Sequence, residues 1–205
     1  MARKSKNLQE KDKIVIFCEG YTEVHYFNML KRKYRGGNVH VEPHKSKRTN
    51  AYGVVHSAIN SPHISGAKKV YAIFDKDRNT IQELTNALNA ANQNGIDVGY
   101  SNISFDLWVL MHFEKVDSYK TQPNIIQKLN KHFKCTSYED DMKNNAKIGD
   151  YLSDKVNNAI SNSLDSPHLN QTGNLINFLS KNPFHNIHNV VEDIFKISKF
   201  KGRYN

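Results

Sequence analysis

The sequence lacks most of the features that mark secreted and membrane proteins. Its 205 residues include 2 cysteines, Cys18 and Cys135, which fit no zinc-ligand spacing and are too few for a disulfide framework. No run approaches the roughly 18 apolar residues of a membrane-spanning helix. The charged start, MARKSKNLQEKDK, leads into an apolar run of only a few residues, unlike a secretory signal. We therefore expect a soluble, cytoplasmic protein whose thiols are reduced.

Acidic residues are scarcer than basic ones. Lys and Arg number 29 against 20 Asp and Glu, a formal charge of +9. A surplus of this size favours a polyanionic partner, because each phosphate that binds Lys or Arg releases condensed counterions. The alternative is a basic protein with no such partner. The hydrophobic content of 38% is enough for one globular domain with a full core.

Short apolar runs alternate with helical patterns over the first part of the chain. The expected strands cover residues 13–18, 38–41, 69–74 and 96–100, and the helices 22–35, 51–60, 80–94 and 105–113, with Thr22 as an N-cap and Gly36-Gly37 as a stop. Alternation of this kind is typical of an α/β fold with a mainly parallel sheet, here four-stranded and flanked by helices. We expect a basic flexible arm at residues 1–12, an α/β core at 13–116 and a helical C-terminal region at 117–205, packed on the core. That region has helical patterns at 122–133, 150–163, 169–181 and 187–200, and 136–147 has the composition of an exposed loop.

Acidic residues follow two of the apolar strands. Glu19 comes directly after the first and Asp75 after the third, with Glu23 one helical turn beyond Glu19 and Asp77 in the same turn as Asp75. Because the carboxyl ends of parallel strands form the ligand crevice of such sheets, we expect these carboxylates to converge. Their mutual repulsion would be relieved by a hard divalent ion, for which Mg²⁺ (or Mn²⁺) is the usual choice beside phosphates. Either motif alone is also common in turns and at helix N-termini.

Basic residues accompany these acids. Lys76 and Arg78 interleave with the two aspartates, and Lys45, Lys47 and Arg48 lie in the segment after the second strand. We expect these cations to bind nucleic acid, with Arg78 close enough to contact a scissile phosphate. For Lys45, Lys47 and Arg48, a solvated charged loop is an equal alternative.

Three histidines are further candidates for a catalytic or metal-binding role. His112 lies in an apolar helical run, where a buried structural histidine is more common than a catalytic one. His185 and His188 are one helical turn apart but have no matching Cys or acidic partner for a metal site. Ser104 has no GxSxG context, which excludes a serine hydrolase of that type.

Four segments carry a resemblance to a known family. The run from Glu19 to Glu23 resembles the EGxTE motif of Toprim domains, and IFDKD resembles their DxD motif. SNISFDLWVLMHFE and NPFHNIHNVVEDIF resemble motifs of RloB-like proteins, a Toprim-related family of bacterial phage-defence loci related to OLD-family nucleases. This family usually has Pro at the position of Ile103, Glu at that of Asp106, and small hydroxyl residues at those of Phe184 and His185.

The resemblance implies a Toprim-like, Rossmann-like fold and a metal site. Glu19 would act as general acid/base or metal ligand, Asp75 and Asp77 would hold Mg²⁺, and Glu23 would complete the shell. Asp106 would be a further metal ligand or would position one. Bound Mg²⁺ polarises phosphoryl oxygens and lowers the pKa of water.

The resulting expectation is a Mg²⁺-dependent nuclease in anti-phage defence, acting on DNA or RNA. Because the chain carries no ATPase module, an energy-using partner would be a separate protein. A non-catalytic nucleic-acid-binding or scaffold protein is the first alternative. A phosphatase of the haloacid dehalogenase type is the second, although Asn79 stands where its DxDxT motif has Thr and the motif follows the third strand instead of the first.

Overall fold

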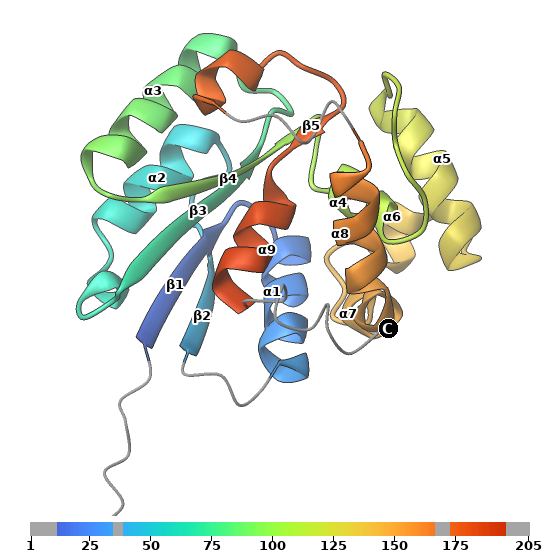
Figure 1. Ribbon diagram of the computed structural model, residues 1–205, viewed down its shortest axis with the longest axis horizontal. Coiled ribbons are helices and arrows are strands. Elements are labelled where there is room, and N and C mark those ends of the chain that lie inside the picture. The colour runs from blue at the N-terminus through green and yellow to red at the C-terminus, as the bar shows by residue number, and fades with distance from the viewer. Residues whose placement is uncertain (1–11, 35–38, 167–172, 196–205) are drawn as a thin grey trace, which may run out of the picture.

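A computed structural model describes residues 12–34, 39–166 and 173–195, and shows a mixed α/β protein (Figure 1). Its sheet has the order β2-β1-β3-β4-β5. The strands β1 (Asp12–Cys18), β2 (Val39–Lys45), β3 (Lys69–Asp75) and β4 (Asp97–Asn102) are parallel, as predicted. The prediction of four strands was wrong, since β5 (Phe184–His185) adds an antiparallel edge beside β4. Two residues are too few for a period-two pattern, so the sequence carried no signal for this strand.

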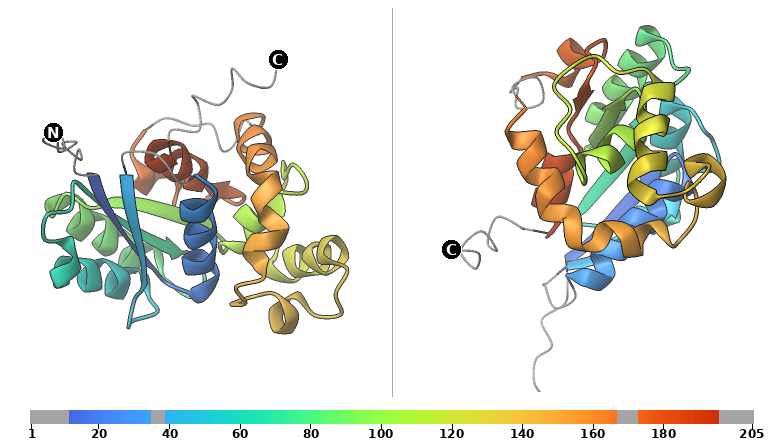
Figure 2. Two further views of the ribbon diagram at one scale, coloured as in Figure 1. Left: turned by 90° about the horizontal axis from the view of Figure 1, so that it is seen from below. Right: turned by 90° about the vertical axis from the view of Figure 1, so that its right-hand side faces the viewer.

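Helices cover both faces of the sheet (Figure 2). On one face, α2 (Ala51–Ile59) and α3 (Ile81–Gln93) pack against each other and against β3 and β4. On the other face, α1 (Tyr21–Lys33) packs on β1 and β2, and α9 (Ile187–Phe195) packs on β4. Both faces of β1 and β3 are therefore buried, which explains why their sequences are continuous apolar runs.

Side chains cap several of the helices, among them α2, α3 and α5 (Gln122–Phe133), whereas α1 and α4 (Asp106–Met111) begin without a side-chain cap. Thr80 and Glu83 form a capping box at α3, and Thr121 caps α5, which has the predicted bounds. Thr22, expected as the N-cap of α1, lies inside the helix, which starts after Gly20. The Thr22 hydroxyl instead accepts a hydrogen bond of 3.0 Å from the Asn144 backbone N–H.

The C-terminal region is helical but more broken than predicted. The helix expected at 150–163 is divided into α7 (Ile148–Leu152), a 3₁₀ turn (Ser153–Lys155) and α8 (Val156–Leu164). Of the helix expected at 169–181, only a 3₁₀ turn at Leu175–Phe178 is found, and residues 169–172 lie outside the described part. The expected loop at 136–147 contains α6 (Tyr138–Asp141), whose Tyr138 is fully buried. A buried tyrosine fixes this segment against the core.

The apolar helix predicted at 105–113 is α4 (Asp106–Met111), and it is the centre of the second half. Every residue of α4 is buried, and the helix contacts α5 and α8 as well as β4. Trp108 in α4 is among the largest fully buried side chains. Through α4 the C-terminal helices are joined to the carboxyl end of the sheet.

Some expectations fall on residues outside the described ranges. They are the arm, except for Asp12 at the start of β1, the stop at Gly36-Gly37, and residues 196–200 of the last helix. The second strand is longer than expected and reaches Lys45. In the described ranges no helix is both long and apolar enough to cross a membrane.

Candidate metal centre

The five predicted metal ligands line one pocket of about 160 Å³. Glu19 follows β1, Asp75 ends β3, and Glu23 and Asp106 lie in the first turns of α1 and α4. The residues that line the pocket are Glu19, Gly20, Thr22, Glu23, Asp75, Asp77, Phe105, Asp106, Lys143 and Asn144. The parallel sheet thus brings together the acids that follow its strands, as the sequence argument expected.

Glu19 and Asp75 are joined directly because β1 and β3 are neighbours. The backbone N–H of Asp75 donates to Glu19 Oε2 at 3.1 Å. Asp75 Oδ2 in turn accepts from the Phe105 backbone N–H at 2.9 Å. The other oxygen, Asp75 Oδ1, is buried and has no hydrogen-bond partner among the described residues. A buried carboxylate oxygen without a donor is strongly disfavoured unless a cation satisfies it.

Asp77 is held by an unusual backbone turn. Its φ is +28°, and its N–H donates to the Ile103 carbonyl oxygen at 3.0 Å. Asn79 supports the same turn: its side chain donates to the Asp75 carbonyl oxygen at 3.0 Å and accepts from the Ala51 N–H at 3.2 Å. The Asp-x-Asp turn is therefore tied to α2 and to the segment after β4.

Glu23 is buried beneath Gly20. Only 4% of Glu23 is exposed, and a Cβ built on Gly20 would lie 2.7 Å from Glu23 Oε2. The glycine is needed for space and not for a positive φ, because its φ is −125°. The close approach of the Glu23 carboxylate to the backbone thus explains the glycine of the motif, Gly20.

Asp106 is surrounded by donors. Its Oδ1 accepts from the Tyr138 hydroxyl at 2.8 Å, and its Oδ2 accepts from Gln122 Nε2 at 2.8 Å, from Lys143 Nζ at 2.8 Å and from Ser104 Oγ at 3.3 Å. Both oxygens are therefore engaged in this arrangement. Asp75, with a free oxygen, is better placed to bind a cation directly, and Asp106 is placed to position α5, α6 and Lys143.

Lys143, Tyr138 and Gln122 were missed by the sequence argument. All three come from the C-terminal region, in which the composition of residues 136–147 predicts an exposed loop. Burial lowers the pKa of Lys143, but the charge and hydrogen bond of Asp106, together with the charges of Asp75 and Glu139, raise it, and the pKa lies above its usual value. Lys143 therefore brings a permanent positive charge to the wall of the acidic pocket.

Burial destabilises the ionised forms of the pocket acids. It raises the pKa of Glu19 to about 7, with a further increase from Asp77. Burial also raises the pKa of Glu23 to about 7, with Glu19 and Asp106 adding to the shift. The pKa of Asp75 is well above its usual range because of burial and then the charges of Glu23 and Glu19. Such acids gain from a nearby cation, since it stabilises the charged forms.

The residues present fit a hard divalent cation. The donor set consists of carboxylate oxygens from two strand ends and two helices, the ligand type that Mg²⁺ and Mn²⁺ prefer. Glu23, Asp75 and Asp77 would hold the ion, with Glu19 as a further ligand or as general acid/base, and the unpartnered Asp75 Oδ1 is the oxygen that most requires it.

None of the predicted nucleic-acid ligands lines the pocket. Lys45 acts on it by charge: it lowers the pKa of Glu19 in opposition to burial, and its Nζ lies 5.4 Å from the centre of the Tyr21 ring. Lys76 donates to the Asn79 carbonyl oxygen at 3.4 Å. Lys47, Arg48 and Arg78 are exposed and do not line the pocket, so the geometry gives Arg78 no contact with the acids in this conformation.

The histidines singled out in the sequence are part of the core. His112 is fully buried, its Nδ1 donates to the Trp108 carbonyl oxygen at 2.9 Å, and burial lowers its pKa to about 4. This confirms a structural role. The ring centres of His185 and His188 are 5.4 Å apart, and both rings are buried. Within the described ranges these two belong to no three-ligand cluster.

Fold and site define a class of protein: a mixed α/β protein with a mainly parallel sheet and a carboxylate pocket at its carboxyl edge. The chain belongs to the RloB-like family, since the family model described as RloB-like protein matches residues 14–194. Neither a curated protein nor a solved structure matches the chain.

Proposed function

We propose that this protein is a Toprim-type, Mg²⁺-dependent nuclease that cleaves phosphodiester bonds of DNA or RNA in anti-phage defence. The observation that carries the proposal is the convergence of Glu19, Glu23, Asp75 and Asp77 on one pocket, with Asp75 Oδ1 buried and unpartnered in the described structure. The EGxTE and DxD segments supply these residues from the ends of adjacent parallel strands.

The roles follow from position and burial. Asp75, Asp77 and Glu23 hold the ion, and Mn²⁺ can replace Mg²⁺. When bound, the ion polarises a phosphoryl oxygen and lowers the pKa of a water. Glu19 lies at the pocket wall beside the Asp75 backbone, where it can accept the proton of the attacking water. Asp106 positions Lys143, whose ammonium group faces the pocket and can contact a phosphate oxygen.

The charge of the chain supports a polyanionic substrate. The formal charge of +9 favours long-range attraction of nucleic acid. Lys45 lies close enough to Glu19 to lower its pKa, Lys76 stands between Asp75 and Asp77 in the chain, and Lys47, Arg48 and Arg78 are exposed and accessible to a ligand. We further propose that the protein acts in the cytoplasm and that any energy-using ATPase partner is a separate protein.

Cleavage assays test the nuclease directly. A panel of plasmid, single-stranded DNA, total RNA and transfer RNA would be incubated with Mg²⁺ or Mn²⁺. The wild-type protein would be compared with Glu19→Gln and Asp75→Asn, and with Asp150→Asn, an exposed acid on α7 outside the pocket. We expect metal-dependent cleavage that Glu19→Gln and Asp75→Asn reduce by about 100-fold or more and that Asp150→Asn leaves unchanged.

A non-catalytic nucleic-acid-binding protein is the second candidate. One observation favours it: Lys143 already supplies a cation to the acidic pocket, so part of the repulsion is offset without a metal. Binding of nucleic acid that is unaffected by Mg²⁺ and by Asp75→Asn, with no cleavage of any substrate, would support this alternative and contradict the nuclease.

A further inference from the structure

A second group of metal-binding side chains lies on the edge strand β2, away from the carboxylate pocket. His40, Glu42 and His44 alternate along this strand, so their side chains emerge from the same face of the sheet. His44 pairs in register with Phe17 of β1, and their rings stack with centres 5.7 Å apart. Lys45, which lies near Glu19, has the opposite parity and belongs to the other face.

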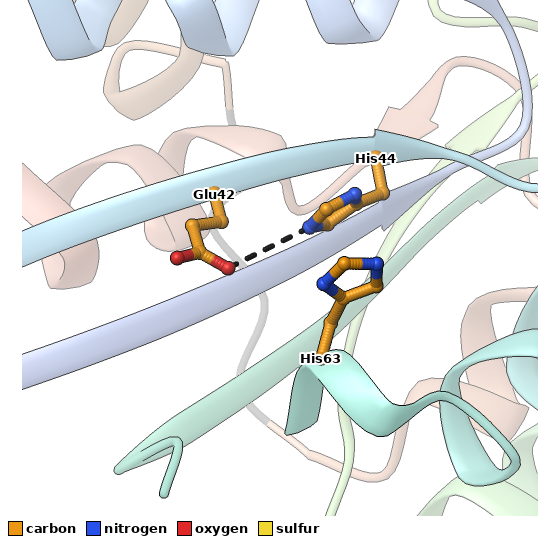
Figure 3. Close-up of side chains that lie close together, drawn as sticks. All are labelled: Glu42, His44 and His63. Atoms are coloured by element: carbon orange, nitrogen blue, oxygen red, sulfur yellow. Dashed lines mark ion pairs between the residues drawn. The ribbon is translucent and has the colours of Figure 1, made fainter. Parts of the chain in front are cut away.

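A third imidazole reaches this face from a distant segment. His63 lies in the 3₁₀ turn Pro62–Ile64, which precedes β3. Its ring stacks on that of His44 with centres 4.2 Å apart and an angle of 28°. Figure 3 shows the two rings face to face, with the Glu42 carboxylate directed toward His44 along the strand. One donor atom from each of Glu42, His44 and His63 lies within 4.8 Å of the others.

One nitrogen of this cluster lacks a hydrogen bond. His44 Nε2 is buried and has no hydrogen-bond partner in the part of the chain that the structure describes, and its distance to Glu42 Oε2 is 3.7 Å. Burial and then the neighbouring His63 lower the pKa of His44. A neutral imidazole with a free nitrogen is the form that binds metals.

We propose that Glu42, His44 and His63 form a second metal site, for a divalent transition-metal ion of the Zn²⁺ class. Two imidazoles and one carboxylate are a typical donor set for Zn²⁺, with bonds of about 2.0–2.2 Å. Such bonds place tetrahedral ligands roughly 3.3 Å apart, so small side-chain movements would bring the three donors into range. His40 Nε2 lies 3.1 Å from Glu42 Oε1 but does not belong to the group whose donor atoms lie within 4.8 Å of one another.

The ligand types separate this site from the carboxylate pocket. Imidazole nitrogens favour Zn²⁺, Co²⁺, Ni²⁺ and Cu²⁺, whereas oxygen-only sites favour Mg²⁺ and Mn²⁺. An ion held here would join the edge strand β2 to the turn that leads into β3. Lys13 Nζ lies 3.6 Å from Glu42 Oε2 and would compete with the metal ion for the carboxylate. The imidazole nitrogens would remain available to the ion.

Co²⁺ titration of the tag-free, metal-stripped protein tests the proposal, because four-coordinate Co²⁺ gives strong visible absorption bands. We expect one such ion per chain, displaced by Zn²⁺ and not by excess Mg²⁺. His44→Ala and His63→Ala should each weaken binding by at least about tenfold. His56→Ala, on α2 outside the cluster, and Asp75→Asn should leave it unchanged.

Since His63 is exposed, its substitution leaves the core intact, and a melting curve of each variant confirms that it folds. In the Asp75→Asn background, Zn²⁺ should raise the melting temperature, and the added His63→Ala substitution should remove that increase. Absence of Co²⁺ and Zn²⁺ binding would overturn the proposal, as would binding that survives both His44→Ala and His63→Ala. Either result leaves the cleavage assay of the carboxylate pocket unaffected.

Discussion

At the scale of single residues, the balance of charge in the acidic pocket depends on Lys143. Its ammonium group is hydrogen-bonded to Asp106, and it shares the pocket wall with four other carboxylates. An internal cation of this kind keeps an acidic site folded before a metal binds. When a metal binds, the same cation opposes it through like-charge repulsion.

Lys143→Met should therefore have opposite effects on stability and on metal binding. Without metal, the loss of the ammonium group leaves Asp106 unpaired and should lower the free energy of unfolding by about 2 kcal/mol. Mg²⁺ affinity should rise, because one positive charge is gone. Urea unfolding with EDTA and with Mg²⁺ measures both effects. Lys147→Met, an exposed lysine on the same segment, is the control, and an equal loss in both variants would contradict the role of Lys143.

Gly20→Ala tests the close approach of Glu23 to the backbone. The new methyl group would lie 2.7 Å from Glu23 Oε2, so the carboxylate must move, which a flexible side chain can do at little cost in stability. We expect the melting temperature to change little and the Mg²⁺ affinity to fall by about tenfold. Calorimetric titration measures the affinity. Unchanged affinity in a folded variant would show that the position of Glu23 does not matter to the ion.

The site acids could be predicted from sequence because each lies close to a recognisable element. Glu19 and Asp75 follow apolar strands, and the rule that parallel strands share a carboxyl edge brings them together without knowledge of the strand order. Lys143 and Tyr138 could not be found in this way. They contact Asp106 from positions more than 30 residues further along the chain, and no local pattern encodes that contact.

At the scale of elements, the short helix α6 forms part of the support of the site. Its Tyr138 is fully buried and donates to Asp106 Oδ1 at 2.8 Å. Burial, together with the charge of Asp106, raises the pKa of Tyr138 well above its usual value, so the hydroxyl remains a donor. Residues 136–147 are mostly polar, and this composition predicts a loop although Tyr138 is buried.

Tyr138→Phe removes that hydroxyl and keeps the ring. Asp106 Oδ1 then loses its donor inside a buried site, so the free energy of unfolding should fall by about 1–3 kcal/mol. Urea unfolding followed by circular dichroism measures this change. Tyr151→Phe, on the exposed part of α7, serves as the matched control. A stability equal to the wild type would show that α6 does not support Asp106.

Elements with strong local signals were predicted well, and those made by tertiary contacts were not. The helix α5 begins and ends at the predicted residues because Thr121 caps it and its apolar face has a clear period. The strand β5 forms only because residues 184–185 meet the free edge of β4, where the Asn186 side chain also donates to the Val98 carbonyl oxygen at 2.8 Å. Such pairing depends on the folded sheet and leaves no trace in two residues.

At the scale of the whole molecule, the acidic pocket links stability to pH. The pKa values of Glu19 and Glu23 are about 7 in the folded protein, against an ordinary value of 4.5. Between these values the folded state binds more protons than the unfolded state. The metal-free protein should therefore lose stability as pH rises from about 4.5 to about 7, and Mg²⁺ should restore it at high pH.

Comparison with Glu23→Gln isolates this effect from the other titrating groups. The glutamine side chain is uncharged at all pH values, so the stability of the variant should fall less than that of the wild type between about pH 5 and about pH 8. Urea midpoints in EDTA at the two pH values give the difference. Identical pH dependence in the two proteins would mean that Glu23 does not titrate in this range.

We propose above all that the carboxylate pocket binds a divalent ion. Mn²⁺ binding followed by electron paramagnetic resonance tests this most directly, because bound Mn²⁺ loses the sharp signal of the free ion. The titration would use His63→Ala, so that imidazole ligands do not contribute. We predict binding that Mg²⁺ displaces, that Asp75→Asn in the same background weakens at least about tenfold, and that Asp150→Asn leaves unchanged. Absence of Mn²⁺ binding, or equal binding after Asp75→Asn, would contradict the account.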